Sequence, residues 1–561
     1  MEIVIIDTRQ IQSYIFGSNR LRENIGASYL VKMATEDWVQ KVLAGQFPAD
    51  ALARPIEDPQ CPAKPVFTGG GNAVLFFREN GQGKTFIRQY SRAVLACAPH
   101  LQLATAVHQF DKLDELPAAV DDAFAQLDVN KQKQPPDTPL LGMGVTVKCR
   151  STGLAAMAMS PLIPGADDGG QYPVSAEILA KLRNINKANK LLDQFNPDKT
   201  RYDFPYDLDN LGRSSGEQSY VAVVHIDGND MGQRIKAYKE GLSGAKAYLV
   251  GSEQISEALN EAGKSALQET VSALIAAVTK DKKGRPIISH TNITGDKITE
   301  IALKEGERLD KKTGKKAGTG NYYLPFRPIV FGGDDITFVC DGRLGISLAL
   351  TFTKAFEAAT ENFIDGRGKI TACAGVAIVK SHYPFARAYD LAESLCRQAK
   401  MYRRRLMIDE GMEDVSCLDW HFALSGLLGS LSRMRKREYC VPSGHLTLRP
   451  VTLTENFVDP LRAWPVINAG IRAFQDTDEG KDKAGWSTKR NKVKALRDAL
   501  RQGPEAVDHF RAAYRLAELP RVTDIGGSIQ LTGWHDQDCV YFDALELADW
   551  HMPLPAGGKN E

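Results

Sequence analysis

The amino-acid sequence predicts an α+β fold in which one strand–helix unit occurs twice and a helical region follows. Three observations support this prediction. Short apolar runs typical of buried strands alternate with segments of helical periodicity, each unit contains a glycine-rich turn between two strand-like runs, and helical patterns dominate residues 413–561. A chain of 561 residues is too long for one hydrophobic core, so we expect several domains.

The second unit, assigned to residues 216–412, is the clearer copy. Residues 219–226 form an apolar run rich in β-branched side chains, which indicates a buried strand, and helical spacing follows near 252–280. Two further strand-like runs flank a glycine-rich hairpin turn at 332–335. A helix, a strand and a last helix complete the order β, α, β-turn-β, α, β, α, which is that of a ferredoxin-like palm domain.

The first unit, assigned to residues 1–150, repeats this order more faintly. Its first strand, residues 2–6, ends at Asp7. Its turn at 69–72 reads Gly-Gly-Gly-Asn, where the second unit has Gly-Gly-Asp-Asp. The sequence therefore predicts two ferredoxin-like palm domains, of which the first is degenerate and the second catalytic.

The remaining segments are expected to connect or extend the two palms. Residues 151–215, rich in Pro, Gly and Asp, are interpreted as a connector, and residues 413–561 as a helical C-terminal domain. Residues 279–320, rich in Lys and Gly, are interpreted as a mobile loop or an insertion beside the second palm.

The composition excludes several classes of function. Lys and Arg number 70 against 69 Asp and Glu, so no global charge attracts the chain to nucleic acid or membrane. No apolar run approaches the roughly 20 residues that span a bilayer, and the N-terminus does not resemble a signal peptide. None of the nine cysteines forms a CxxC pair, which favours reduced thiols in the cytoplasm. We therefore expect a cytoplasmic protein with no membrane partner.

Three aspartates lie at strand ends that a palm brings together. Asp227 ends the first strand of the second unit, and Asp334 and Asp335 lie on the hairpin turn. Carboxylates this close repel one another unless a cation lies between them. Magnesium prefers such oxygen ligands together with substrate phosphates. The sequence therefore predicts that these aspartates, with Ile226 as a further metal ligand, hold two Mg²⁺ or Mn²⁺ ions and catalyse phosphoryl chemistry.

The residues around the aspartates suit a nucleotide. Glycines in the hairpin turn admit a ligand without a Cβ clash, and main-chain N–H groups at the start of a helix can hold phosphate oxygens. A lysine at the end of the last palm helix can reach a phosphate as a point charge. The predicted nucleotide-binding residues of this unit are Gly228, Asn229, Asp230, Gly332, Gly333 and Lys400.

Each feature alone has a simpler explanation. Hairpin turns favour Gly and Asp in any case, Asp230 can cap the helix that follows, and Lys400 is more often a cation placed at a helix C-terminus. The combination is more specific, because both acidic turns end apolar strands in the order that a palm requires.

These motifs resemble those of the large palm-domain subunit of type III CRISPR effector complexes, a family that makes cyclic oligoadenylates. The resemblance covers most of the chain up to about residue 450. Its motifs are Gln12 to Phe16, Leu21-Arg22-Glu23, Gly26 to Leu30, Asp227 to Gly232, Gly332 to Asp335, Gly375 to Ile378, Ala399-Lys400, Asp419-Trp420-His421 and Leu446 to Pro450.

The resemblance implies a defined activity. Two palms face each other around two ATP molecules, and the second palm holds the metal ions. The product is a ring of 3′–5′-linked adenylates that acts as a second messenger in antiviral defence, made when target RNA binds the effector complex. The resemblance also assigns nucleotide contacts to the first palm, namely Ser28, Gly69, Gly70 and Gly71.

The chain departs from the family in two respects. We find neither an N-terminal HD nuclease domain nor a paired-cysteine zinc module between the palms, so we expect a compact form of the subunit. Its expected partners are ATP, guide and target RNA, and CRISPR effector subunits. Two alternatives stay open: a non-catalytic nucleotide- or RNA-binding scaffold, and a cyclase that makes a different cyclic nucleotide.

Overall fold

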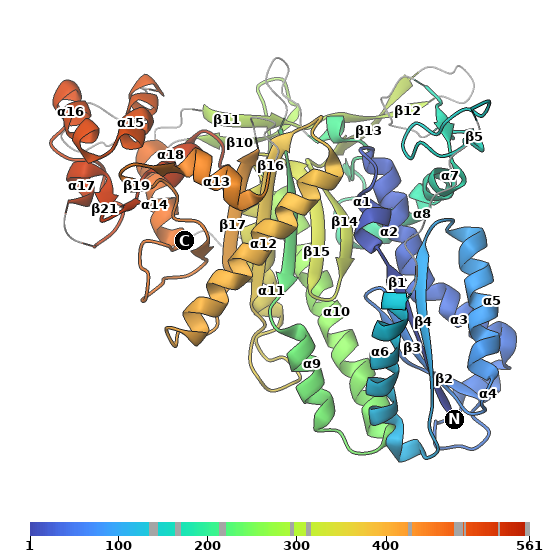
Figure 1. Cartoon of the computed structure of the whole chain (residues 1–561). Helices are drawn as coiled ribbons and strands as arrows, with labels where there is room; N and C mark the ends of the chain where they lie inside the picture. Colours follow the sequence, from blue (N-terminus) through green and yellow to red (C-terminus); the bar gives the residue numbers. More distant parts are fainter. Residues whose placement is uncertain are drawn as a thin grey trace.

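The structure, a computed structural model of the chain, contains two lobes built on sheets of the same strand order (Figure 1). It describes residues 1–133, 144–162, 170–211, 220–291, 297–309, 316–423, 429–475, 486, 490–525 and 528–555, with only the main chain at 307–309, 316, 317 and 490. No helix among these residues is both long and apolar enough to cross a membrane.

The first palm is an antiparallel sheet with helices on its faces. Its strand order is β2-β3-β1-β4, which is the ferredoxin-like arrangement predicted from the sequence. Its elements are β1 (Glu2–Arg9), α1 (Ile11–Phe16), α2 (Leu21–Thr35), α3 (Asp37–Gln46), α4 (Ala49–Ala53), β2 (Ala63–Gly69), β3 (Asn72–Phe77), α5 (Gln82–Cys97), β4 (Gln102–Gln109) and α6 (Leu116–Lys133).

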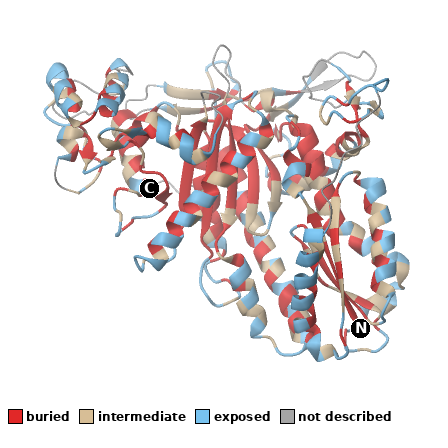
Figure 2. Ribbon diagram, in the orientation of Figure 1, coloured by how far each residue is buried: buried red, intermediate tan, exposed pale blue. Residues whose placement is uncertain are grey.

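The second palm repeats this arrangement. Its strand order β14-β15-β8-β16 matches that of the first palm position by position, which confirms the α+β class with two ferredoxin-like units. The central strands are buried on both faces (Figure 2). Its elements are β8 (Tyr220–Gly228), α9 (Met231–Glu240), α10 (Ala245–Ala276), β14 (Phe326–Gly332), β15 (Asp335–Asp341), α11 (Gly345–Ala359), β16 (Ala372–Lys380) and α12 (Phe385–Ile408).

The sheet of the second palm continues beyond residue 412. Strand β17 (Cys417–Ala423) pairs in parallel with β16, and β20 (Val451–Thr452) pairs with β17. The boundary that the sequence places at 412 therefore falls inside the sheet. Helix α12 acts as the crossover between two parallel strands, a long-range pairing that the local pattern of residues 413–561 does not reveal.

The C-terminal region beyond this sheet is mainly helical. A small sheet of order β18-β19-β22-β21 lies among the helices. The elements are α13 (Leu431–Tyr439), β18 (Cys440–Val441), β19 (Gly444–His445), α14 (Trp464–Gln475), α15 (Arg490–Gln502), α16 (Pro504–Tyr514), α17 (Ile529–Thr532), β21 (Trp534–His535), β22 (Asp538–Cys539) and α18 (Phe542–Ala548).

Residues 279–320, expected to be a loop or an insertion, form an insertion of strands between α10 and β14. The lysine-rich run at 311–315 lies outside the described residues. The strands are β9 (Val278–Lys280), β10 (Pro286–Thr291), β11 (Lys297–Ala302), β12 (Glu305–Leu309) and β13 (Lys316–Tyr323).

The connector between the palms is anchored to the first palm by a buried carboxylate. The Glu23 side chain accepts hydrogen bonds from Ser18 Oγ at 2.6 Å, Ser151 Oγ at 2.9 Å and Tyr172 Oη at 2.7 Å. These contacts fix α2 against the connector. Its elements are β5 (Ala158–Met159), β6 (Pro173–Val174), α7 (Ala176–Arg183), α8 (Ile185–Leu192) and β7 (Tyr202–Asp203).

The two palms share one hydrophobic core, which fixes their relative position. Apolar side chains of α2 and the first sheet pack with Val221 and Val223 of β8 and with Tyr389 of α12. The ring of Phe16 stacks on that of Tyr389 with centroids 4.0 Å apart. Because this core spans both lobes, the space between them is a defined feature of the fold.

A substitution at Gly375 tests the packing of α12 on β16. A Cβ at this position would lie 2.0 Å from the carbonyl oxygen of Ala392 and 2.4 Å from the amide nitrogen of Cys396. Both are main-chain atoms, so Gly375→Ala should destabilise the protein by about 3 kcal/mol. The midpoint of urea unfolding, followed by circular dichroism, measures this loss.

The matched control is Gly45→Ala in α3, where a Cβ meets no atom within 4 Å. Alanine in a helix should there raise stability by about 0.5–1 kcal/mol. Equal midpoints for the two variants would contradict the packing argument.

Candidate active site

The three predicted aspartates lie at one end of the second palm sheet. Asp227, near the end of β8, stands directly opposite Asp335, the first residue of β15. Directly opposed residues of an antiparallel pair carry their side chains on the same face. Asp334 lies in the turn, where its main-chain carbonyl accepts the N–H of Gly228 at 3.1 Å. The structure thus brings together the residues that the sequence predicts to be catalytic.

Two glycines allow this close approach. A Cβ on Gly228 would lie 2.6 Å from Cβ of Asp334, so no larger residue fits beside the turn. Gly333 has a φ of +61°, a conformation that favours glycine. The structure therefore gives both predicted glycines a steric reason.

Helix α10 holds the tip of the hairpin. The N–H of Gly333 donates to Asn260 Oδ1 at 3.0 Å. A Cβ on Gly263 would lie 2.2 Å from the carbonyl oxygen of Gly333. The helix and the hairpin are therefore in direct main-chain contact, and the position of Asp334 depends on it.

Burial and neighbouring charge raise the proton affinity of the two hairpin aspartates. Burial, and then the charges of Asp227 and Asp335, raise the pKa of Asp334 to about 7. Burial also raises the pKa of Asp335, and His225, whose Nδ1 lies 3.4 Å from Asp335 Oδ1, opposes this rise. The Asp335 side chain is 47% exposed, yet its Oδ1 is buried without a hydrogen-bond partner. Such a site favours a cation.

Lys400 supplies positive charge to this group. Its Nζ lies 2.7 Å from Asp227 Oδ2 and donates to the carbonyl oxygen of Gly228 at 3.0 Å. Among the described residues no three His, Cys, Asp or Glu side chains are already arranged to hold a metal. The oxygen donors and the unpartnered Asp335 Oδ1 nevertheless suit a hard divalent cation, which would take over the role of the ammonium. The side chain of Ile226 is a buried hydrocarbon without a donor atom, so this residue could contribute only its carbonyl oxygen.

Asn229 and Asp230 make other contacts. Asn229 is buried and its Nδ2 donates to Thr371 Oγ1 at 2.8 Å, while Asp230 Oδ2 pairs with Arg403 Nη2 at 2.8 Å. Neither residue lines the cavities beside the aspartates, and the same holds for Asp227, Gly228 and Lys400, which lie behind the hairpin. The structure therefore places these two predicted nucleotide ligands in a network that anchors the turn before α9.

A cavity of about 300 Å³ separates the palms at the aspartates. The second palm contributes Asp334, Asp335 and Gly332 to its lining, and the first palm contributes predicted residues of its own. A cavity of this size suits a small ligand, and both palms would touch it. The lining residues from the first palm include Ser28, Lys32, Gly69, Gly70 and Gly71.

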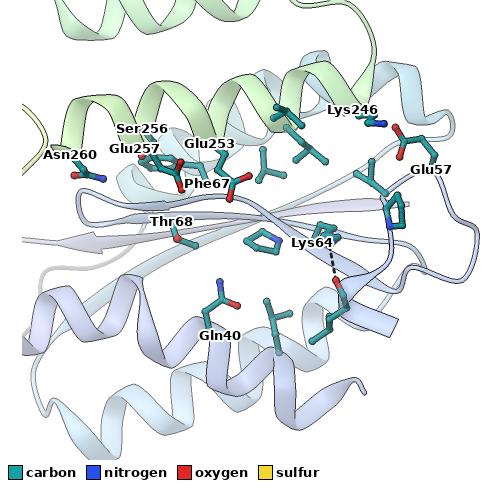
Figure 3. A pocket seen from close by; sticks show the side chains of 18 residues that line it. Gln40, Glu57, Lys64, Phe67, Thr68, Lys246, Glu253, Ser256, Glu257 and Asn260 are labelled. Carbon is teal, nitrogen blue, oxygen red and sulfur yellow. Dashed lines mark hydrogen bonds between the residues drawn. The ribbon is translucent and has the colours of Figure 1, made fainter. Parts of the chain in front are cut away.

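The interdomain space continues along α10. An adjoining cavity of about 330 Å³ also reaches Gly332 and Asp335. Beyond it, a cavity of about 590 Å³ lies between α10 and the first palm (Figure 3). Glu253 and Glu257 of α10 line this outer cavity, and none of the three aspartates does. The outer cavity is larger, but the hairpin aspartates line only the other two, of which the cavity of about 300 Å³ is called the inner cavity.

The first palm keeps part of the same arrangement. Asp7 of β1 stands opposite Asn72 of β3, at the positions that Asp227 and Asp335 occupy in the second palm. Lys131 Nζ of α6 lies 2.8 Å from Asp7 Oδ2, as Lys400 of α12 pairs with Asp227. The first palm has thus retained one acid–lysine pair and lost the two hairpin acids.

Sequence reasoning missed three residues that line the inner cavity. They are Lys32 of α2, Asn260 of α10 and Arg327 of β14. Each is one polar residue within an ordinary helix or strand pattern, and no motif marks it. Only the packing of one palm on the other gives these residues a common site.

Replacing Asp334 should stabilise the metal-free protein at neutral pH. The pKa of Asp334 is higher in the folded protein than the value near 3.9 of an unfolded chain, so the folded state binds the proton more tightly. Its contribution to stability is therefore present at low pH and is lost as pH rises through about 7. In EDTA, Asp334→Asn should melt a few degrees higher than the wild type at pH 8, with the difference vanishing near pH 4.

The control for this experiment is Asp409→Asn, an exposed carboxylate at the end of α12. It should leave the melting temperature unchanged at both pH values. A lower melting temperature for Asp334→Asn at pH 8 would contradict the mutual repulsion.

Comparison with known proteins relates the second palm to a protein family. Residues 220–408 match the second palm domain of the Cas10/Cmr2 family, a stretch that begins at β8 and ends at α12. No curated protein matches the chain.

Solved structures extend the likeness over nearly the whole chain. The Csm1–Csm4 cassette in complex with pppApApA is 13% identical, with a TM-score of 0.51, over 98% of this chain and 69% of that chain. The same cassette with AMPPNP is 15% identical, with a TM-score of 0.49 and 98% and 69% coverage. Csm1 from T. onnurineus is 13% identical, with a TM-score of 0.48 and 98% and 70% coverage. At these identities the first comparison supports a common fold.

Proposed function

Taking as premise that this chain is a Cas10-like protein whose residues 220–408 form a Cas10/Cmr2 second palm domain, we propose that it converts ATP into cyclic oligoadenylates. The observation that carries the proposal is the meeting of Asp227, Asp334 and Asp335 at one end of the second palm sheet, where the two hairpin aspartates line a cavity that both palms share. The reaction is a nucleotidyl transfer. The 3′-oxygen of one ATP attacks the α-phosphorus of another, pyrophosphate leaves, and a final intramolecular transfer closes the ring.

The residues of the chain supply binding and orientation. The carboxylates of Asp227, Asp334 and Asp335 would hold two Mg²⁺ or Mn²⁺ ions, which activate the 3′-hydroxyl and stabilise the leaving pyrophosphate when bound. Lys400, which pairs with Asp227 in the free protein, would be released by the metal ions and could then contact a phosphate of the nucleotide. Gly332 and Gly333 leave room for the ligand at the hairpin, and Asn260 holds the hairpin in place.

The first palm would bind the second nucleotide. Ser28 and the turn at Gly69 to Gly71 line the same cavity as the catalytic hairpin. This turn lacks hairpin carboxylates, so it can lie close to the phosphates without repelling them. One nucleotide on each palm would place a 3′-hydroxyl and an α-phosphate on opposite sides of one site, which is the orientation that transfer requires.

The proposed partners follow from the similar structures. In those structures Csm1 is bound to Csm4 and to AMPPNP or pppApApA. We extend this to the present chain as a role in antiviral defence, with a Csm4-like CRISPR effector subunit as a neighbour and with guide and target RNA as activators. The nine free cysteines fit a cytoplasmic location for this role.

One observation favours a different function, a nucleotide-binding subunit without chemistry. Lys400 occupies Asp227, and the described side chains form no ready metal cluster. Such a scaffold would bind ATP and release no pyrophosphate. An assay of pyrophosphate release from ATP therefore distinguishes the scaffold from the enzyme.

Removing the hairpin acids should abolish synthesis. The purified protein, with ATP and Mg²⁺ or Mn²⁺ and with or without target RNA and the effector complex, should release pyrophosphate and form cyclic adenylates, which mass spectrometry resolves. Asp334→Ala with Asp335→Ala should lower the rate at least a thousandfold, because the site loses two of its three carboxylates. EDTA should have the same effect, and the other three triphosphates, supplied separately, show which base is used.

The matched control is Asp409→Ala with Glu410→Ala, two neighbouring exposed carboxylates at the end of α12. This variant should keep wild-type activity. Full activity in the hairpin double variant would exclude the assigned site.

Lys400→Met should bind Mn²⁺ more tightly than the wild type. The ammonium group lies 2.7 Å from Asp227 Oδ2, so it competes with a divalent cation for that oxygen. Loss of one positive charge at this distance should raise Mn²⁺ affinity at least tenfold, measured by calorimetry without nucleotide. Lys354→Met, on the exposed face of α11, is the control, and equal affinities for both variants would show that the two cations do not compete.

A further inference from the structure

Arg327 is a buried arginine without a carboxylate partner among the described residues. It lies on β14, five residues before the catalytic hairpin, and is 1% exposed. Its one hydrogen bond to a described residue is long, from Nη1 to the carbonyl oxygen of Pro205 at 3.4 Å. Its Nε is buried and has no partner. The ring of Tyr206, 5.9 Å from the guanidinium carbon, provides only a weak cation–π contact.

Other buried arginines of this protein are paired with acids. Arg449 contacts Asp543 at 3.0 Å and Glu546 at 3.3 Å, and Arg234 binds both carboxylate oxygens of Asp365 at 2.7 Å. A buried charge without a partner strongly disfavours the folded state. Burial lowers the pKa of Arg327 to about 10, which still leaves it protonated at neutral pH. An anion from outside the chain would compensate this charge.

The position of Arg327 identifies that anion. Arg327 lines the same inner cavity as Asp334, Asp335 and Gly69 to Gly71. Along β14 it lies about 17 Å from Gly332, at about 3.3 Å per residue. One nucleotide, together with the arginine side chain, can span this separation. The lining therefore has Asp334 and Asp335 at one end and Arg327 at the other, while Lys32 and Glu36 of the first palm, also in the lining, pair with each other.

We propose that Arg327 binds the 5′-triphosphate of the acceptor nucleotide and thereby forms a phosphate subsite at the end of the cavity remote from the aspartates. This inference deepens the proposed function and rests on it, because only a transfer between two nucleotides has an acceptor. In the transfer, the 3′-oxygen of the acceptor forms a bond to the α-phosphorus of the donor. The bond from that phosphorus to the departing pyrophosphate breaks, and the hydroxyl proton passes to solvent.

The acceptor keeps its own 5′-triphosphate in this step, and a basic group must hold it away from the acids. The planar guanidinium of Arg327 offers several N–H donors in a geometry that fits phosphate oxygens. With the acceptor triphosphate held there, the donor is the nucleotide whose α-phosphate lies at the aspartates. By holding the acceptor triphosphate away from the aspartates, Arg327 would leave only the donor triphosphate in position to react.

Binding to the full-length chain in EDTA tests this subsite without catalysis. Calorimetry with inorganic tripolyphosphate, ATP and adenosine compares the wild type, Arg327→Met, Arg327→Lys and the exposed-surface control Arg433→Met. We expect Arg327→Met to lose at least tenfold in affinity for tripolyphosphate and ATP and to keep its affinity for adenosine. Arg327→Lys should recover part of the loss, and Arg433→Met should match the wild type.

Stability distinguishes a ligand-binding arginine from a structural one. Because Arg327 has no anionic partner among the described residues, Arg327→Met should melt at the same temperature as the wild type or higher. Tripolyphosphate should raise the melting temperature of the wild type and of Arg433→Met, but not that of Arg327→Met. Unchanged tripolyphosphate affinity in Arg327→Met overturns the proposal. A lower melting temperature of Arg327→Met, together with weaker binding of tripolyphosphate, ATP and adenosine alike, also overturns the proposal.

The hairpin double variant separates this proposal from the proposed function. Asp334→Ala with Asp335→Ala should still bind tripolyphosphate through Arg327, since the aspartates only repel it. If the wild type makes no cyclic product but its tripolyphosphate binding depends on Arg327, the subsite stands and the synthase fails. If product forms and binding is independent of Arg327, the subsite alone is overturned.

Discussion

The repulsion among Asp227, Asp334 and Asp335 is the constraint on which the site depends. The fold holds these carboxylates together through strand pairing, through the bond from Gly228 to Asp334, and through the contact of α10 with the hairpin. Burial, and then the charges of Asp227 and Asp335, raise the pKa of Asp334 to about 7. A protein that maintains such a cluster loses stability for it, which is typical of a functional site rather than of a structural turn.

The two palms share one arrangement of strands and charges but differ in the hairpin acids. Both sheets place an aspartate opposite the end of a hairpin and pair it with a lysine from the last palm helix, Asp7 with Lys131 and Asp227 with Lys400. Only the second palm adds two hairpin acids. Because the palms share one hydrophobic core, the tandem chain presents both halves of a site without a second copy of itself.

Charge is distributed unevenly along the space between the palms. Asp334 and Asp335 line one end of the inner cavity, and Arg327, which has no carboxylate partner within the described part of the chain, lines the other. Glu253 and Glu257 line the outer cavity along α10. A nucleotide has a polar base and ribose at one end and phosphates at the other. In the reaction that we propose, the inner cavity, with Arg327 remote from the acids, would offer separate places for the phosphate that reacts and for the triphosphate that does not.

The sequence by itself determined the repeated unit, the strand ends and the acidic turns, because hydrophobic periodicity and turn chemistry are local properties. It did not show that β17 joins the second palm sheet, that Asn229 and Asp230 serve the turn before α9, or that Asn260 and Arg327 reach the inner cavity. These features arise from pairing and packing between segments far apart in the chain. Only the tertiary structure decided them, since the partner of a polar side chain is set by what packs against it.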